Sequence, residues 1–114
     1  MHEVGLMQNI LDLALEKAQA QGAQQIHEIQ VRVGDASGVT PESLDLAFEV
    51  VKRGTIAEKA QFKVESVPIV SYCRACDQEF RPVDLLLYEC PQCHQISSEV
   101  RQGKELELAA LEIS

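Results

Sequence analysis

A chain of 114 residues is long enough for one compact domain, or for one domain with a small satellite. Hydrophobic residues make up 46% of it and aromatic residues only 4%, with no Trp, so we expect a folded chain with an aliphatic core. The formal net charge of −8 disfavours a duplex nucleic-acid binder, because contacts to phosphate require clustered Lys and Arg.

The first half of the chain predicts a helix followed by a strand. Apolar residues recur at spacings of three and four from Leu6 to Ala18, which places one apolar stripe along a helix that Gly22 ends. Ile29, Val31 and Val33 then alternate with polar residues, as in a half-buried strand that ends at Gly34.

A second helix and two further strands follow. Thr40 and Pro41 suit the N-cap and first position of a helix, and Gly54 suits its end. Alternating apolar residues in "QFKVESV" (61–67) and "KELELAALEI" (104–113) predict strands. We therefore expect an α+β fold: two helices on a three-stranded sheet, with an inserted four-cysteine zinc-ribbon domain.

The insertion contains all four cysteines of the chain, as Cys73xxCys76 and Cys90xxCys93 with thirteen residues between the pairs. Each CxxC turn directs two sulfurs at one point, and the intervening segment can return as a hairpin that brings the second turn opposite the first. Four thiolates form the closed tetrahedral site of structural zinc. The spacing therefore predicts a zinc ribbon.

Other uses of these cysteines fit less well. Two disulfides conflict with a reducing cytoplasm. A thioredoxin-like redox motif needs one CxxC at the start of a helix, not two facing pairs. "CPQCH" matches the attachment motif of c-type haem, but haem attachment requires export and leaves Cys73 and Cys76 unexplained. His94 in this motif is then either a solvated loop residue or a neighbour of the metal.

The zinc-ribbon segment has few apolar residues with which to build a core. The main candidates are Phe80, Val83, Leu85 to Leu87 and Ile96. A structural zinc ion supplies the missing folding free energy, with apparent values of roughly 10 to 16 kcal/mol in zinc-finger peptides at neutral pH. We therefore expect a zinc-ribbon domain over 68–98 and a second domain formed by 1–67 and 99–114.

The sequence offers no catalytic constellation. The three histidines lie at positions 2, 27 and 94, His27 reads as a surface or half-buried strand residue, and no glycine-rich phosphate loop is present. A zinc ion held by four thiolates has no open coordination position. The protein is therefore predicted not to be an enzyme.

The sequence shows neither the pattern of a signal peptide nor that of a membrane-spanning segment. The first residues lack the basic segment of a signal peptide, and no stretch approaches the ~18 to 20 apolar residues that span a bilayer. We expect a cytoplasmic protein with no membrane partner.

The N-terminus carries a second possible metal site. The amine of Met1, the deprotonated amide of His2 and the His2 imidazole can converge on one ion through a five- and a six-membered chelate ring, and Glu3 can supply a fourth donor. Such a planar, nitrogen-rich set suits Ni(II) or Cu(II) rather than zinc. The alternative is a solvated helix start at which Glu3 favours only the helix dipole.

Four features together resemble one known family. They are "MHE" directly before an amphipathic helix, "RVG" at the end of the first strand, "GTIAE" after the second helix, and CxxC followed by CPxCH before a final strand. This combination resembles the hydrogenase nickel-incorporation proteins, the HypA (HybF) family, over essentially the whole chain. The resemblance implies a nickel-binding α/β domain with a zinc-ribbon domain.

The resemblance also implies a function. It suggests a nickel metallochaperone that delivers Ni(II) to the large subunit precursor of [NiFe]-hydrogenase together with a nickel-binding maturation GTPase. His2 and Glu3 match the family's nickel site, and Cys73, Cys76, Cys90 and Cys93 match its zinc site. A homodimer through an exposed sheet edge is a further possibility. The other functions that fit the sequence are a zinc-ribbon interaction module, a nucleic-acid-binding ribbon and a small CxxC redox enzyme.

Overall fold

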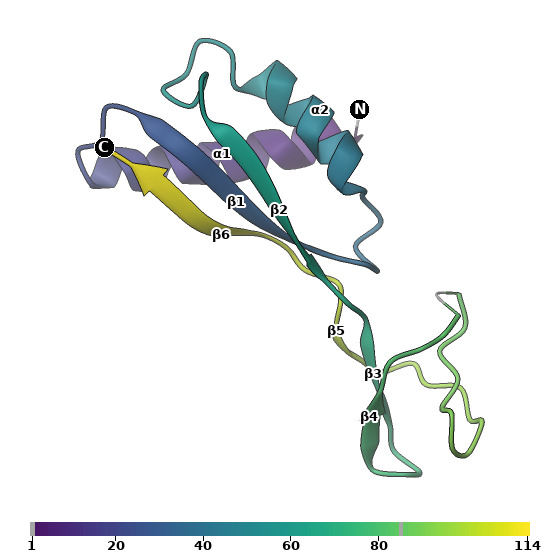
Figure 1. Ribbon diagram of the computed structural model, residues 1–114. Coiled ribbons are helices and arrows are strands. Elements are labelled where there is room, and N and C mark those ends of the chain that lie inside the picture. The colour runs from purple at the N-terminus through teal and green to yellow at the C-terminus, as the bar shows by residue number, and fades with distance from the viewer. Residues whose placement is uncertain (1, 85) are drawn as a thin grey trace. The chain divides into compact units, whose positions relative to one another are not determined.

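A computed structural model describes residues 2–84 and 86–114 (Figure 1). In chain order the elements are α1 (His2–Ala20), β1 (Ile26–Gly34), α2 (Pro41–Val51), β2 (Gln61–Val67), β3 (Val70–Cys73), β4 (Gln78–Phe80), β5 (Val100–Gln102) and β6 (Leu106–Ile113). They form two three-stranded sheets, ordered β2-β1-β6 and β4-β3-β5. No helix among the described residues is long and apolar enough to cross a membrane.

The chain divides into two compact units. The first comprises the chain up to Arg32, Val39–Glu65 and Glu107–Ser114, and the second comprises Val33–Gly38 and Ser66–Leu106. The second unit is longer than the cysteine-rich segment 68–98 because it also contains β5 and the loop that follows β1.

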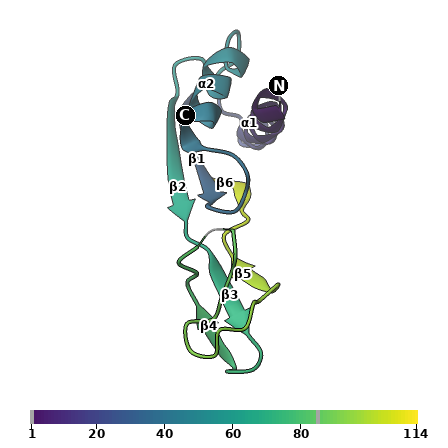
Figure 2. The same cartoon turned by 90° about the vertical axis from the view of Figure 1, so that its right-hand side faces the viewer.

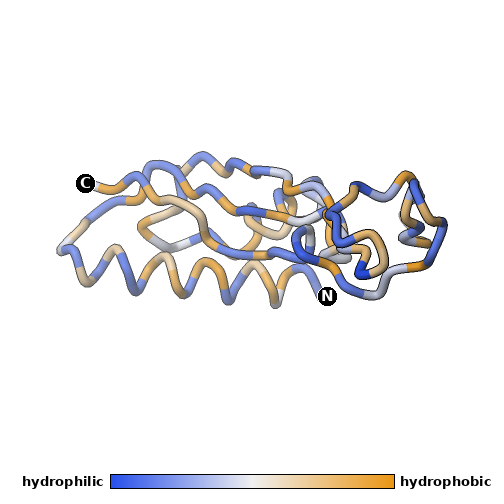
Figure 3. The backbone as a smooth tube through the Cα atoms, turned by 90° about the horizontal axis from the view of Figure 1, so that it is seen from below, coloured by the Kyte–Doolittle hydropathy of each residue, from blue (hydrophilic) through white to orange (hydrophobic). Residues whose placement is uncertain are grey.

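The helix α1 supplies one side of the first unit's core. It begins at His2, four residues before the apolar pattern starts, and ends two residues before Gly22, which has a φ of 69°. Hydrophobic and hydrophilic residues alternate along its turns (Figure 3). The predicted stripe is confirmed, since the buried residues of α1 are Met7, Ile10, Leu11, Ala14 and Ala18.

The sheet of the first unit is mixed. Gln25 and Ser114 exchange two backbone hydrogen bonds of 3.1 and 3.0 Å at the start of β1 and the end of β6, so these strands are antiparallel. The β1 and β2 strands run in the same direction (Figure 2), as expected of strands joined through a helix. The predicted alternation of Ile29, Val31 and Val33 is confirmed, because all three are buried.

The helix α2 forms as its capping residues predict. The Thr40 hydroxyl accepts a hydrogen bond of 3.1 Å from the Ser43 amide, and Pro41 occupies the first helical position. Phe48 is 1% exposed and its ring stacks on Phe62 of β2 with centroids 5.1 Å apart. Both helices lie on the same face of the sheet (Figure 2).

The second unit contains three strands that the sequence did not predict. The central β3 pairs antiparallel with both β4 and β5. The prediction of a hairpin in the segment between the cysteine pairs was wrong, because the hairpin β3–β4 surrounds the first CxxC turn instead. A CxxC turn reverses the chain by itself, so the strands form on either side of it.

The core of the second unit is smaller than predicted. Phe80 is buried beside Cys73 and Cys90, with Cys76 and Tyr88 packed against them. The other predicted core residues are exposed, at 100% for Val83, 94% for Leu86, 49% for Leu87 and 55% for Ile96, and Leu85 lies outside the described residues. An apolar side chain enters a core only where neighbours exist to cover it, and this unit has too few.

Two glycines meet closely within the second unit. A Cβ atom on Gly34 would lie 2.0 Å from the Gly103 carbonyl oxygen, and Gly103 itself has a φ of 116°. The Gly34 amide donates to the Glu105 carbonyl at 2.7 Å, and the Ala36 amide donates to the Gly103 carbonyl at 2.7 Å. The loop after β1 is therefore held to the segment before β6, and neither glycine has room for a side chain.

Candidate metal centre

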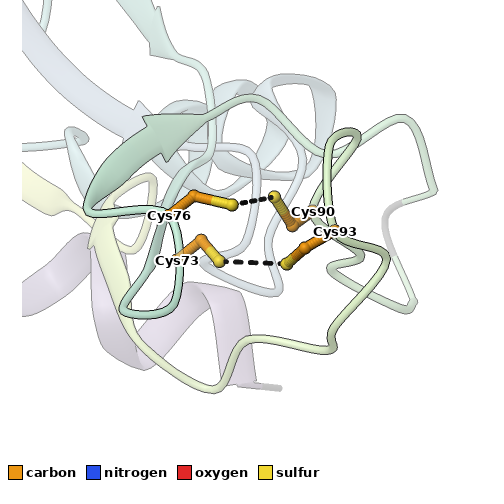
Figure 4. Close-up of side chains that lie close together, drawn as sticks. All are labelled: Cys73, Cys76, Cys90 and Cys93. Carbon is orange, nitrogen blue, oxygen red and sulfur yellow. Dashed lines mark hydrogen bonds between the residues drawn. The ribbon is translucent and has the colours of Figure 1, made fainter.

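The four cysteine sulfurs lie together (Figure 4). Cys73 Sγ lies 3.5 Å from Cys93 Sγ, and Cys90 Sγ lies 3.9 Å from Cys76 Sγ, so each close pair joins the two CxxC turns. All four sulfurs lie within 4.8 Å of one another. A tetrahedral ion with Zn–S bonds of about 2.3 Å holds its sulfurs about 3.8 Å apart. The donor set and its spacing therefore fit zinc.

Both CxxC turns have the same backbone pattern, and we call each of them a knuckle. In the first knuckle (72–77) Cys73 pairs with Gln78, and in the second (89–94) the Cys90 amide donates to the Gln95 carbonyl at 2.9 Å, so each first cysteine pairs with the residue five positions on. The residue after each second cysteine is left-handed, with φ of 51° at Asp77 and 66° at His94. The knuckles are thus two copies of one local structure.

The electrostatics of the sulfurs favour a bound cation. Backbone N–H groups, first of Cys93 and then of Gln92, donate to the Cys90 sulfur and lower the pKa of Cys90 to about 6. Hydrogen bonding with Cys93, followed by burial, raises the pKa of Cys76 to about 12. Cys90 is therefore largely a thiolate at neutral pH, whereas Cys76 retains a proton that a divalent ion would displace on binding.

The geometry leaves no coordination position open. Four protein sulfurs complete a tetrahedral shell, and catalytic zinc sites have three protein ligands and a water or substrate. Among residues 2–84 and 86–114 these cysteines are the one group of three or more Cys, His, Asp or Glu side chains placed to surround an ion. The arrangement can hold a metal and stabilise a fold.

The residues predicted at the N-terminus lie outside this group. His2 is exposed and is the first residue of α1, Glu3 is half-buried in the first turn, and Met1 lies outside the described residues. The first amides of a helix have no acceptor within the helix, so the His2 nitrogen is not used in the helix ladder. The nickel site expected here needs one side chain, because its other nitrogen donors belong to the main chain.

The other two histidines have local partners. His27 Nε2 lies 2.6 Å from the Ser114 hydroxyl, and the residue is half-buried on β1. His94 Nδ1 lies 3.3 Å from Glu89 Oε2, and its side chain is 71% exposed. The described sulfur cluster is complete without His94.

Sequence reasoning did not single out Tyr72, Asp77 and Arg101. The Tyr72 hydroxyl donates to Asp77 Oδ1 across the first knuckle, and the Arg101 guanidinium lies 4.0 Å from the Tyr72 ring centroid. No sequence signal marked Tyr72 and Asp77, because the residues that flank the two CxxC motifs differ in type. Nothing in the sequence indicated a role for Arg101, since β5 was not predicted.

The comparisons with known proteins agree along the entire chain. The family described as "Hydrogenase/urease nickel incorporation, metallochaperone, hypA" matches residues 1–113. The chain belongs to the HypA family. It is 46% identical to "Hydrogenase maturation factor HypA" of Picosynechococcus sp. (strain ATCC 27264 / PCC 7002 / PR-6) over 113 residues, which cover 99% of each chain. The resemblance found in the sequence is confirmed.

Solved structures of HypA proteins share the fold. "Solution structure of HypA protein" matches 100% of this chain and 97% of its own with a TM-score of 0.73 and 26% identity. The Ni metallochaperone HypA from Helicobacter pylori matches 97% of this chain and 96% of its own with a TM-score of 0.69 and 24% identity. The predicted α+β class with a four-cysteine site is therefore confirmed, and HypA proteins are metallochaperones and maturation factors, not enzymes.

Proposed function

We propose that this protein binds Ni(II) at its N-terminus and delivers it during maturation of [NiFe]-hydrogenase, while Cys73, Cys76, Cys90 and Cys93 hold a structural zinc ion. The observation that carries the proposal is the HypA family match over residues 1–113, which includes the N-terminal segment. In this scheme the unit with α1 binds the nickel that is transferred, and the unit with the cysteines retains the zinc ion.

The two sites have opposite chemistry, and this contrast supports the division of roles. The zinc ion would be enclosed by four thiolates, two of them buried, which favours a long residence time. The nickel ion would sit at an exposed helix start, bound by the Met1 amine, the His2 amide and the His2 imidazole, with Glu3 as a fourth donor. The exposed site suits a metal that must be released to another protein.

The delivery partners follow from the family's role. We propose that the protein acts in the cytoplasm with a nickel-binding maturation GTPase and with the precursor of the hydrogenase large subunit. The net charge of −8 supports protein partners over nucleic acid.

Replacing His2 tests the nickel site. We expect His2→Ala in the untagged protein to weaken Ni(II) binding at least about tenfold, because the imidazole closes one of the two chelate rings. Equilibrium dialysis with Ni(II) measures this affinity. His27→Ala is the matched control, since His27 lies at the start of β1 and hydrogen-bonds Ser114, so this variant should bind nickel normally. Equal affinity in both variants would count against the proposal.

Nickel affinity should also fall as the pH is lowered. Binding requires loss of protons from the Met1 amine, the His2 amide and the His2 ring, so protons compete with the metal. We expect the dialysis affinity to decrease steadily from pH 8 to pH 6. A flat profile would contradict nitrogen ligation.

A further inference from the structure

The two knuckles share a backbone, but their side chains close them differently. In each knuckle the residue before the first cysteine faces the left-handed residue after the second one: Tyr72 faces Asp77, and Glu89 faces His94. These pairs bridge the two ends of each turn. The inference below rests on the proposed zinc ion, because it concerns how the knuckles release it.

The bridge across the first knuckle is firmly anchored. The Tyr72 hydroxyl donates to the Asp77 carboxylate, and the Tyr72 ring lies under the Arg101 guanidinium. Arg101 Nε in turn donates to Glu99 Oε2 at 2.7 Å. The Tyr72 carbonyl also accepts a hydrogen bond of 2.5 Å from the Ser97 hydroxyl. A hydrogen bond to a carboxylate is stronger than one between two neutral groups, and several contacts hold Tyr72 in place. This bridge therefore keeps the first knuckle closed.

The bridge across the second knuckle is weak. Glu89 Oε2 and His94 Nδ1 are 3.3 Å apart, and their side chains are 51% and 71% exposed. Exposed pairs of this kind contribute little, about 0 to 1 kcal/mol. Among the described residues, the other hydrogen bonds that close the second knuckle are backbone ones, from the Cys90 amide to the Gln95 carbonyl and from the His94 amide to the Cys90 carbonyl, both at 2.9 Å.

The exposure of the cysteines follows the same asymmetry. Cys73 and Cys90 are buried, Cys76 is half-buried, and Cys93 is the most exposed of the four. Cys76 and Cys93 occupy equivalent places, one at the end of each knuckle, next to Asp77 and His94 respectively. The outer sulfur of the weakly closed knuckle is therefore also the one that water reaches most easily.

We propose that Tyr72 and Asp77 are positioning residues that latch the first knuckle, so that the second knuckle opens first and Cys93 is the first sulfur to leave the zinc ion. In this step the Cys93 sulfur would keep the electron pair of its bond to zinc and leave as a thiolate, and a water molecule would take the vacant position. The first knuckle would stay closed, and Cys73 and Cys76 would retain the ion.

The order of alkylation tests this proposal. Zinc-loaded protein is treated with N-ethylmaleimide at constant neutral pH, and the modified cysteine is identified by mass spectrometry in the singly modified species. In the wild type we expect Cys93 to carry most of the label. In Tyr72→Phe, which removes the latch but keeps the ring under Arg101, we expect labelling of Cys76 relative to Cys93 to rise about fivefold, as loss of one hydrogen bond implies.

Two further variants separate a latch from a general loss of structure. Asp77→Asn retains an oxygen acceptor and tolerates the left-handed backbone but loses the charge, so its labelling pattern should lie between those of the wild type and Tyr72→Phe. Tyr88→Phe removes the other tyrosine hydroxyl, which has no hydrogen-bond partner among the described residues, and should match the wild type. A change in Tyr88→Phe as large as in Tyr72→Phe would overturn the proposal.

The remaining outcomes are equally decisive. Cys73 or Cys76 labelled before Cys93 in the wild type, or an unchanged pattern in Tyr72→Phe, would overturn the latch while leaving the zinc assignment intact. Purified protein without one bound zinc per chain would instead contradict the proposed function itself.

Discussion

At the scale of single residues, the second unit contains positions where adding or removing one atom would disrupt a close contact. The four cysteine sulfurs lie within 4.8 Å of one another, with 3.5 and 3.9 Å between the two pairs that join the knuckles, so a shift of one sulfur would change the candidate metal site. Gly34 and Gly103 must lack side chains, because their backbones touch. Both features concern the second unit, where a small core makes each contact more important.

Removing one sulfur should empty the zinc site. We expect Cys73→Ser to reduce bound zinc from one per chain to well below half, because a hydroxyl is a poor replacement for a thiolate ligand. Metal analysis by mass spectrometry measures the stoichiometry. Retention of one zinc per chain would show that Cys73 is not a ligand.

Adding one methyl group at Gly34 should destabilise the protein. The new Cβ would lie 2.0 Å from the Gly103 carbonyl oxygen, so the backbone must shift, at a cost of about 1 to 3 kcal/mol. Urea denaturation measures the loss. Gly5→Ala is the control: no atom lies within 4 Å of its Cβ, and alanine favours the helix α1. A variant Gly34→Ala as stable as the wild type would mean that the two glycines do not touch.

At the scale of secondary-structure elements, the first unit is the part whose architecture was predictable. Residues that repeat at helical or strand spacing, such as Ile29, Val31 and Val33, mark which face is buried. Thr40 and Pro41 fix where α2 begins. The Thr40 side chain accepts a hydrogen bond from an amide of the first turn, and Pro41 has no amide N–H that would need a partner there.

Replacing the central aromatic residue of this unit should cost much of its stability. Phe48 is 1% exposed and stacks on Phe62, so we expect Phe48→Ala to lower the free energy of unfolding by about 3 to 5 kcal/mol. Thermal unfolding followed by circular dichroism measures this change. Leu46→Ala, on the same helix but 71% exposed, should change it by less than about 0.5 kcal/mol. Similar losses in both variants would place Phe48 outside the core.

The short strands of the second unit could not be predicted in the same way. β4 and β5 have three residues each, too few for an alternation to stand out. Val83 and Leu86 are apolar yet exposed, since hydrophobicity alone does not state whether neighbours are available to bury a side chain. The cysteine spacing predicted the metal site, but it did not indicate Tyr72 or Arg101, whose roles depend on strand pairing.

At the scale of the whole molecule, two compact units with different cores share one chain. The first has a core between two helices and a sheet, and the second has a small buried cluster of Cys73, Phe80 and Cys90 around the candidate metal site. Small units of this kind usually depend on a metal or on disulfides for their stability. Under the proposed function, one metal is exchanged while another maintains the fold.

Removing zinc should therefore unfold only part of the chain. After treatment with a strong chelator, we expect hydrogen exchange to rise severalfold in β3, β4 and β5 and to stay unchanged in α1 and β1, because β3 carries Cys73 and pairs with β4 and β5. Hydrogen–deuterium exchange mass spectrometry resolves the two regions. Uniform loss of protection would show that the units do not fold independently.

The central claim is that nickel and zinc occupy two different sites in one chain. Nickel titration of the untagged, zinc-loaded protein, beside a form with a Gly-Ser extension before Met1, tests this most directly when both metals are counted. We expect one nickel and one zinc per untagged chain, and zinc alone in the extended form, whose Met1 nitrogen is no longer a free amine. Nickel bound equally by the extended form, or bound with loss of zinc, would contradict the account.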